Sequence, residues 1–122
     1  MKKILVVDDD LSILEVLQMM LEEEEYMIET TAISEEIYQR VADFGPHLIL
    51  LDVLMTGIDG RIIARTLKQQ DHTRHIPIIM LSATPTVEEA ARDAGGDEFL
   101  GKPFEIDALL MLIEKHVGSP AG

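Results

Sequence analysis

The chain has 122 residues, no cysteine and a formal net charge of −13, from 23 acidic and 10 basic residues. This length suits one domain with a single core. The acidic balance argues against direct nucleic-acid binding, which needs clustered Lys and Arg, and the lack of cysteine excludes a disulfide frame or a thiolate metal site.

The first expected element is a buried strand at Ile4–Val7, directly after Met1-Lys2-Lys3. Four apolar residues are too few for a signal-peptide core or a membrane span, so we expect a cytoplasmic protein without a membrane partner. Similar apolar runs occur at His47–Leu51 and Ile76–Leu81. Because they lack polar alternation, they are typical of parallel strands covered on both faces. We also predict strands at Ile28–Ala32 and Glu98–Gly101.

Helical spacing of apolar residues fills the intervals between these strands. Ser12 and Glu15 predict a capping box for the first helix, and Ser34 is the expected cap of the second. The third expected helix follows Gly60 and runs through Lys68, and the other two run from Thr86 to Ala94 and from Ile106 to Val117. Five strands alternating with five helices predict an α/β fold with a doubly wound parallel sheet.

Polar side chains follow four of the expected strands. Asp8, Asp9 and Asp10 come after the first strand, Asp52 ends the third, Ser82 ends the fourth and Lys102 follows the fifth. In doubly wound sheets, ligands bind outside the carboxyl ends of the strands. The sequence therefore predicts a polar site at this edge.

Clustered carboxylates indicate a divalent cation at that edge. At a separation of about 4 Å, each pair would repel by roughly 4 kcal/mol at an effective dielectric near 20. Mg²⁺ prefers oxygen ligands and bridges carboxylate to phosphate, so we expect Asp9 and Asp52 as direct ligands and Asp8 as a ligand through water. Helix capping is the alternative role for the three acids. It accounts for Asp10, but not for Asp52 and Lys102 at the same edge.

Asp52 ends an otherwise apolar strand, where a charge is costly unless it is paired or metal-bound. Beside a metal, it can attack phosphorus and form an acyl phosphate. Lys102 can pair with Asp52 and then with the phosphoryl group, and Ser82 can donate a hydrogen bond to a phosphoryl oxygen. Considered singly, Lys102 and Ser82 would be interpreted as solvated surface residues. Only their placement at the same edge as the carboxylates favours a functional role for them.

Five segments together resemble the receiver domain of two-component response regulators, across nearly the whole chain. They are Val6-Val7-Asp8-Asp9-Asp10, Leu50-Leu51-Asp52-Val53-Leu54-Met55, Asp59-Gly60, Met80-Leu81-Ser82-Ala83 and Asp97-Glu98-Phe99-Leu100-Gly101-Lys102-Pro103-Phe104. The resemblance implies a flavodoxin-like fold with strand order 2-1-3-4-5 and a cis Lys102-Pro103 peptide.

The resemblance also implies how the domain works. Asp52 would accept a phosphoryl group from a histidine kinase or a histidine phosphotransfer protein. Mg²⁺, or Mn²⁺ in its place, would be bound by Asp9, Asp52 and the main-chain carbonyl of Leu54. Ser82 and Phe99 would form the switch, acting on an effector or a dimer through the fourth helix, fifth strand and fifth helix.

The chain departs from the family pattern at Thr56, where proline is usual, which predicts a looser loop from Leu54 to Asp59. We expect the receiver domain to occupy residues 1–117, with residues 118–122 as a short tail or linker.

We expect a signalling switch that is not an enzyme, and three other functions are alternatives. An aspartyl-phosphate hydrolase would carry a second Asp two residues after the nucleophile, where this chain has Leu54. A dinucleotide-binding domain would have a glycine-rich turn after the first strand, where this chain has three acids. A pseudo-receiver scaffold is expected to lack one of Asp9, Asp52 and Lys102, and all three are present.

Overall fold

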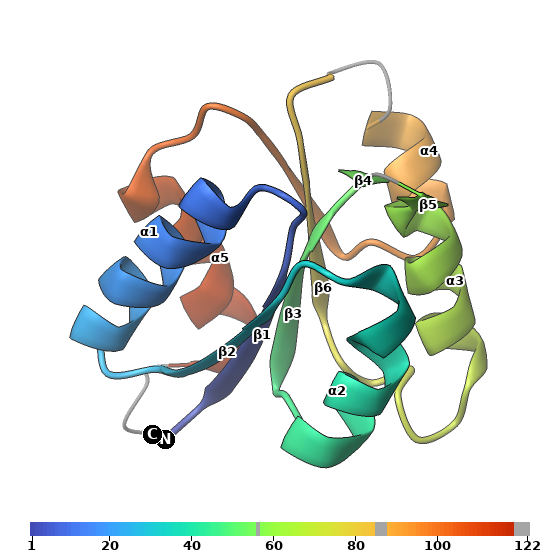
Figure 1. Cartoon of the computed structure of the whole chain (residues 1–122), viewed down its shortest axis with the longest axis horizontal. Coiled ribbons are helices and arrows are strands. Elements are labelled where there is room, and N and C mark those ends of the chain that lie inside the picture. Colours follow the sequence, from blue (N-terminus) through green and yellow to red (C-terminus); the bar gives the residue numbers. More distant parts are fainter. Residues whose placement is uncertain (56, 85–87, 119–122) are drawn as a thin grey trace.

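A computed structural model describes residues 1–55, 57–84 and 88–118. A parallel sheet forms the middle layer, with helices on both of its faces (Figure 1). Thr56, the expected start of the fourth helix at Thr86 and most of the expected tail lie outside the described residues. In the part of the chain that is described, no helix has the length and apolar character needed to cross a membrane.

The main sheet has five strands in the order β2-β1-β3-β6-β7, all paired in parallel. Its strands are β1 (Lys3–Val7), β2 (Met27–Thr31), β3 (Leu48–Asp52), β6 (Ile78–Ser82) and β7 (Glu98–Gly101). Counted along the main sheet, this is the expected order 2-1-3-4-5. The expected cis Lys102-Pro103 peptide is also present.

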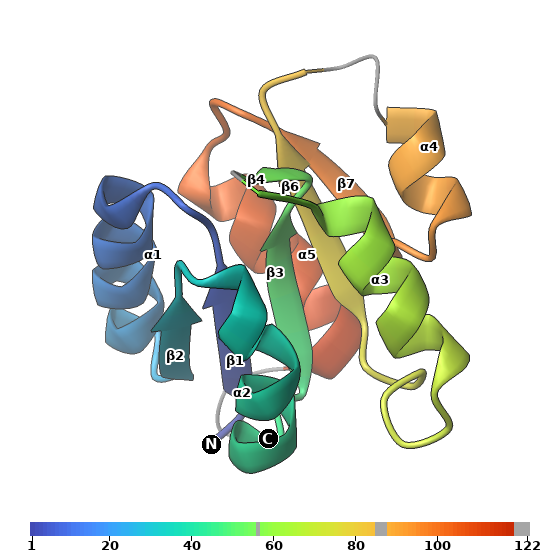
Figure 2. The ribbon, with the colours of Figure 1, turned by 45° about the vertical axis from the view of Figure 1, so that its right-hand side comes forward.

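Two helices cover one face of the sheet and three cover the other (Figures 1 and 2). The first pair is α1 (Leu11–Glu23) and α5 (Ile106–Val117), and the second group is α2 (Ile37–Phe44), α3 (Gly60–Gln69) and α4 (Glu88–Asp93). A 3-10 turn at Ser34–Glu36 precedes α2.

Alternate residues of each central strand face the two helical layers. In β3, Ile49 and Leu51 pack with α2 and α3, whereas Leu48 and Leu50 pack with α1 and α5. All four are fully buried. This burial on both faces is why the strand is apolar throughout until it reaches Asp52.

The expected helix caps at Ser12 and Ser34 were wrong. Helix α1 is capped by Asp10, whose carboxylate accepts hydrogen bonds from the backbone N–H groups of Ser12 and Ile13. A carboxylate one residue before the helix is as good a cap as a serine and also favours the helix dipole. Ser34 lies inside the 3-10 turn, and α2 begins without a side-chain cap.

After β3 comes a small two-stranded ribbon, which was not predicted from the sequence. Strands β4 (Leu54–Met55) and β5 (Ile58–Asp59) pair in antiparallel fashion. Met55 is buried, and Gly57 between the strands has φ +88°, which favours glycine. The segment from Leu54 to Asp59 therefore contains two short paired strands, and whether it is looser than in other members of the family stays a prediction.

Candidate metal and phosphoacceptor site

The expected polar residues meet at the carboxyl edge of the sheet. Asp8 directly follows β1, Asp52 and Ser82 are the last residues of β3 and β6, and Lys102 directly follows β7. Figure 2 shows the neighbouring strands β1, β3 and β6 running to this edge. The topology thus brings together residues separated by up to 94 positions in the sequence.

Three carboxylates form the centre of the site. Asp8, Asp9 and Asp52 each offer an oxygen atom, and these oxygens all lie within 4.8 Å of one another. Asp8 is fully buried and Asp52 is 5% exposed. A compact set of carboxylate oxygens from two strands fits a hard divalent cation such as Mg²⁺, which takes oxygen ligands.

The crowding of carboxylates perturbs the pKa of Asp52. Burial, followed by the charge of Asp8, raises the pKa of Asp52 to about 6, against the opposing effects of Lys102 and of a hydrogen bond from the Leu54 N–H. The environment therefore disfavours a third negative charge unless a cation offsets it. A carboxyl with a perturbed pKa at a strand end is typical of a functional site.

Lys102 reaches into the carboxylate cluster from the end of β7. Its Nζ lies 2.7 Å from Asp8 Oδ2 and 3.6 Å from Asp52 Oδ1. Burial alone would lower the lysine pKa, but the hydrogen bond to Asp8 and the charges of Asp8 and Asp52 raise it overall. Lys102 is thus an ammonium ion that the protein keeps charged, and its shorter contact is with Asp8 rather than with the expected Asp52.

Ser82 and Phe99 lie on neighbouring strands. Ser82 is 1% exposed, and its Oγ accepts a hydrogen bond of 3.0 Å from the backbone N–H of Thr84. Phe99 is half-buried and packs against the core on the side of α2, α3 and α4. Ser82 follows Met80 by two positions and therefore shares that face of the sheet. The two expected switch residues are on the same side of the sheet.

The backbone around Asp52 is packed closely against the start of α3. A Cβ atom added at Gly60 would lie 2.3 Å from the Asp52 carbonyl oxygen, and the Gly60 N–H donates to the Val53 carbonyl at 2.7 Å. The Asp59-Gly60 motif did not by itself predict this role of Gly60. A glycine at the start of a helix could have indicated this contact, because the backbone can approach so closely only where there is no side chain.

Comparisons with known proteins agree with this geometry. Residues 4–114 match the family described as the response regulator receiver domain. Among curated relatives, the response regulator MprA of Mycolicibacterium vanbaalenii is 36% identical over 88% of this chain, and the DNA-binding dual master transcriptional regulator RpaA of Synechocystis is 29% identical over 90%. These matches cover 47% and 46% of the relatives, so the chain spans about half their length.

Solved structures of similar proteins have the same fold over their whole length. The response regulator TrrA of Thermotoga maritima, solved with Mg²⁺ and beryllofluoride, is 33% identical with a TM-score of 0.86, covering 94% of this chain and 98% of TrrA. The receiver domain of a Pseudomonas aeruginosa sensor histidine kinase, solved with magnesium in its active-site cleft, is 27% identical with a TM-score of 0.87, covering 97% and 98%. With the matching family, sheet order and acidic edge, the chain belongs to the receiver domains of two-component response regulators.

Proposed function

We propose that this receiver domain is a signalling switch that accepts a phosphoryl group on Asp52. The observation that supports this most strongly is the meeting of Asp8, Asp9 and Asp52 within 4.8 Å, with the Lys102 ammonium against two of them. Carboxylates supply both the nucleophile and the cation ligands, and the lysine supplies a fixed positive charge.

A divalent cation would be held by Asp9, Asp52 and the Leu54 carbonyl, with Asp8 contributing through water. When bound, Mg²⁺ offsets the negative charge of the carboxylates and of the phosphoryl oxygens. The three acids leave the site too negative to receive a phosphoryl group without such help.

The chemical step is a transfer between two nucleophiles. An Asp52 carboxylate oxygen forms a bond to phosphorus while the bond from phosphorus to the donor's imidazole nitrogen breaks, and the imidazole leaves with its electron pair. Lys102 stabilises charge on the phosphoryl oxygens, and the Ser82 hydroxyl donates a hydrogen bond to one of them. The domain thus catalyses only its own phosphorylation and dephosphorylation and releases no product of another substrate.

A groove beside the site fits the phosphodonor. It has a volume of about 620 Å³ and is lined mainly by apolar side chains of α1 and the segment after β7, among them Ile13, Met20, Phe104 and Ile106, and Lys102 also lines it. On α1, Leu11, Val16 and Met19 are also exposed. We propose that a helix of a histidine kinase or phosphotransfer protein packs here and presents its phosphohistidine to Asp52.

The output of the switch is proposed to run through Ser82 and Phe99 to the face formed by α4, β7 and α5. When Ser82 turns toward a phosphoryl oxygen, the space it leaves on that side of the sheet can receive the Phe99 ring. An effector or a second copy would then bind the altered face. Structures with and without beryllofluoride that show the same Phe99 rotamer and the same Ser82 position would contradict this coupling.

The proposed extent of the domain is residues 1–117, followed by a short tail or linker. RpaA is described as DNA-binding, and this chain matches less than half of it. We therefore propose that DNA-binding or enzymatic output, if this receiver controls one, belongs to a separate domain, because the acidic receiver itself is unsuited to bind nucleic acid.

Binding of a phosphoryl mimic tests the proposed function. Beryllofluoride with Mg²⁺ should raise the melting temperature, because a ligand that binds only the folded state stabilises it. Asp52→Asn should abolish the shift, and Asp9→Ala should also remove the smaller shift given by Mg²⁺ alone. If Asp9→Ala and the parent respond equally to Mg²⁺, Asp9 is not a ligand, and if Asp52→Asn responds like the parent, Asp52 does not hold the phosphoryl group.

A further inference from the structure

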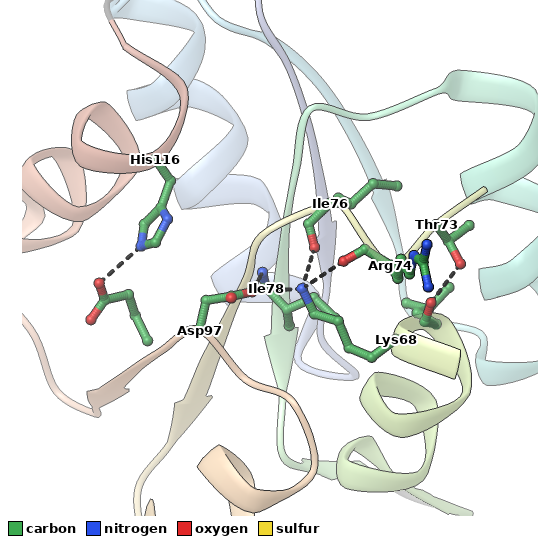
Figure 3. A network of polar contacts seen from close by, with 9 residues as sticks. Lys68, Thr73, Arg74, Ile76, Ile78, Asp97 and His116 are labelled. Carbon is green, nitrogen blue, oxygen red and sulfur yellow. Dashed lines mark hydrogen bonds and ion pairs between the residues drawn. The ribbon is translucent and has the colours of Figure 1, made fainter. Parts of the chain in front are cut away.

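Lys68, near the end of α3, joins three parts of the chain away from the phosphorylation edge (Figure 3). Its Nζ donates hydrogen bonds to Asp97 Oδ2 at 2.8 Å, to the Ile76 carbonyl at 2.8 Å and to the Arg74 carbonyl at 3.3 Å. An ammonium group has three donors, so these contacts use its full capacity. The side chain is 20% exposed.

Asp97 completes the connection on the side of α4 and β7. The carboxylate oxygen that receives Lys68 also accepts a hydrogen bond of 2.8 Å from the backbone N–H of Ile78, at the start of β6. The Asp97 N–H in turn donates to the Ile78 carbonyl at 2.8 Å. The turn between α4 and β7 is thereby fixed both to the sheet and to the end of α3.

The turn itself is shaped to pass over the Lys68 side chain. A Cβ atom at Gly95 would lie 2.7 Å from Lys68 Cγ, and the φ of Gly95 is +108°, a conformation that favours glycine. Gly96 is equally close to the sheet, because its Cβ would lie 2.5 Å from Met80 Cγ. The lysine stem and the turn are therefore in direct contact.

Helix α4 gains little from side-chain packing in the part that is described. Its buried side chains there are Ala91 and, just beyond the helix, Ala94. An alanine buries far less apolar area than the leucines and isoleucines of α3 and α5, so it anchors a helix weakly. We therefore expect the polar contacts of the turn after α4 to contribute to its attachment.

We propose that the Lys68–Asp97 ion pair is a clamp that fixes the C-terminal end of α4 and its turn into β7. Because α4 follows β6, whose last residue is Ser82, and runs back along the sheet, the clamped end is the end away from the phosphorylation edge (Figure 2). The clamp itself exists without a phosphoryl group. Its role in signalling rests on the proposed function: a change at Ser82 moves the N-terminal end of α4, while the clamped end stays in place.

Amide hydrogen exchange of Lys68→Met tests the clamp. Methionine keeps an unbranched apolar stem against Gly95 and removes the ammonium. Exchange at Gly95, Gly96 and Asp97 should rise roughly tenfold or more, while exchange in β1 and β3 stays as in the parent. Asp97→Asn keeps an oxygen for the Ile78 N–H, should give the same local rise, and should add little when combined with Lys68→Met.

Lys115→Met is the matched control. This substitution also removes a charged contact, the one between Lys115 Nζ and Glu98 Oε2 at 2.7 Å, but the Lys115 side chain is 64% exposed and its partner lies in β7 rather than in the turn. It should leave exchange at residues 95–97 unchanged. The clamp is refuted if Lys68→Met changes exchange at these residues less than about twofold, or if it raises exchange in β1 and β3 to the same degree.

A second exchange experiment, with Mg²⁺ and beryllofluoride added, tests the role of the clamp in signalling. In the parent, changes in exchange should occur in residues 82–84 and at the start of α4 but not at 95–97, and in Lys68→Met they should extend to 95–97. If the melting temperature of the parent does not rise with beryllofluoride, the proposed function is contradicted. The exchange result for Lys68→Met without beryllofluoride is still valid in that case. A parent that shows the shift, with equal changes at both ends of α4, contradicts the role of the clamp.

Discussion

Lys102 lies closer to Asp8 than to Asp52, at 2.7 Å against 3.6 Å. Asp8 is fully buried, so its carboxylate needs a partner of opposite charge, and its other oxygen already accepts from the Asp10 N–H at 3.0 Å. Lys102 therefore connects β7 to β1 and leaves Asp52 with an incompletely offset charge. This is the arrangement expected of a carboxylate that is to gain a cation and a phosphoryl group.

Replacing Gly60 with alanine should strongly destabilise the domain. The new Cβ would lie 2.3 Å from the Asp52 carbonyl oxygen, and backbone cannot yield as a flexible side chain can. We expect a loss of about 1–3 kcal/mol in the free energy of unfolding, measured by urea denaturation.

Gly101→Ala is the control for this substitution. Its Cβ would meet the Ser82 carbonyl oxygen at 3.9 Å, an ordinary contact, so stability should change by no more than about 0.5 kcal/mol. Equal effects of the two substitutions would show that the close contact at Gly60 is not the cause.

Tyr26→Phe should stabilise the domain. Tyr26 is 2% exposed, and its hydroxyl has no hydrogen-bond partner among the residues that the structure describes. Burial, with the charges of Glu114 and Glu24, also raises the pKa of this hydroxyl. Removing a buried group without a partner should raise the free energy of unfolding by about 1 kcal/mol. Tyr38→Phe, at a tyrosine that is 38% exposed, should have no such effect, and a loss of stability in Tyr26→Phe would contradict the assignment.

His47 should make stability fall at mildly acidic pH. Its Nδ1 accepts a hydrogen bond of 2.9 Å from the Lys3 N–H, and burial together with the charges of Lys2 and Lys3 lowers the pKa of His47 below its ordinary value of 6.5. The folded state thus prefers the neutral ring. Its contribution is complete above the ordinary pKa and is lost as pH falls through that value toward the lower pKa of the folded state.

The comparison that isolates this effect is His47→Asn, in which the amide oxygen can take the place of Nδ1 but cannot be protonated. Urea denaturation of both proteins across this pH range should show the parent losing stability relative to the variant as pH falls. A constant difference between them would mean that His47 titrates alike in both states.

The fold was predictable because each central strand is apolar on both faces, as in Leu48–Leu51, and because helical spacing separates the strands. The β4–β5 ribbon was not, since two pairs of residues are too few to show a period. A capping role was weighed for Asp10 and also expected for Ser12, and the sequence could not choose between them, because both residue types favour the cap position and the two-residue difference depends on where the helix begins.

Which residues form the site was predictable from the polar residues at the end of each strand, but the contacts between them were not. That Lys102 would lie nearer to Asp8 than to Asp52 depends on side-chain geometry across β7, β6, β3 and β1, which no local pattern encodes. The same holds for Lys68 and Asp97, which are 29 residues apart in the sequence.

Leu54 should slow the loss of the phosphoryl group. It lies two residues beyond Asp52, its side chain is 48% exposed, and it offers no hydrogen bond that could orient an attacking water. Thr84, two residues beyond Ser82, is small and only weakly polar. Leu54→Asn and Leu54→Glu should therefore speed dephosphorylation by admitting and orienting water.

The decay of the phosphorylated domain after donor removal, in Mg²⁺, provides the measurement. Ile62→Asn, at another exposed apolar residue on the outer side of α3, serves as a control that should decay like the parent. Unchanged or slower decay in both Leu54 variants would show that this side chain does not govern the approach of water.

The intact mass of the domain after incubation with acetyl phosphate and Mg²⁺ shows whether Asp52 is the phosphoacceptor. We expect one added phosphoryl group in the parent, labile as an acyl phosphate is, and none in Asp52→Asn. Asp59→Asn, which can still cap α3 through its amide oxygen, should be phosphorylated like the parent. A phosphoryl group retained in Asp52→Asn, or found on Ser82 or a histidine, would contradict the account.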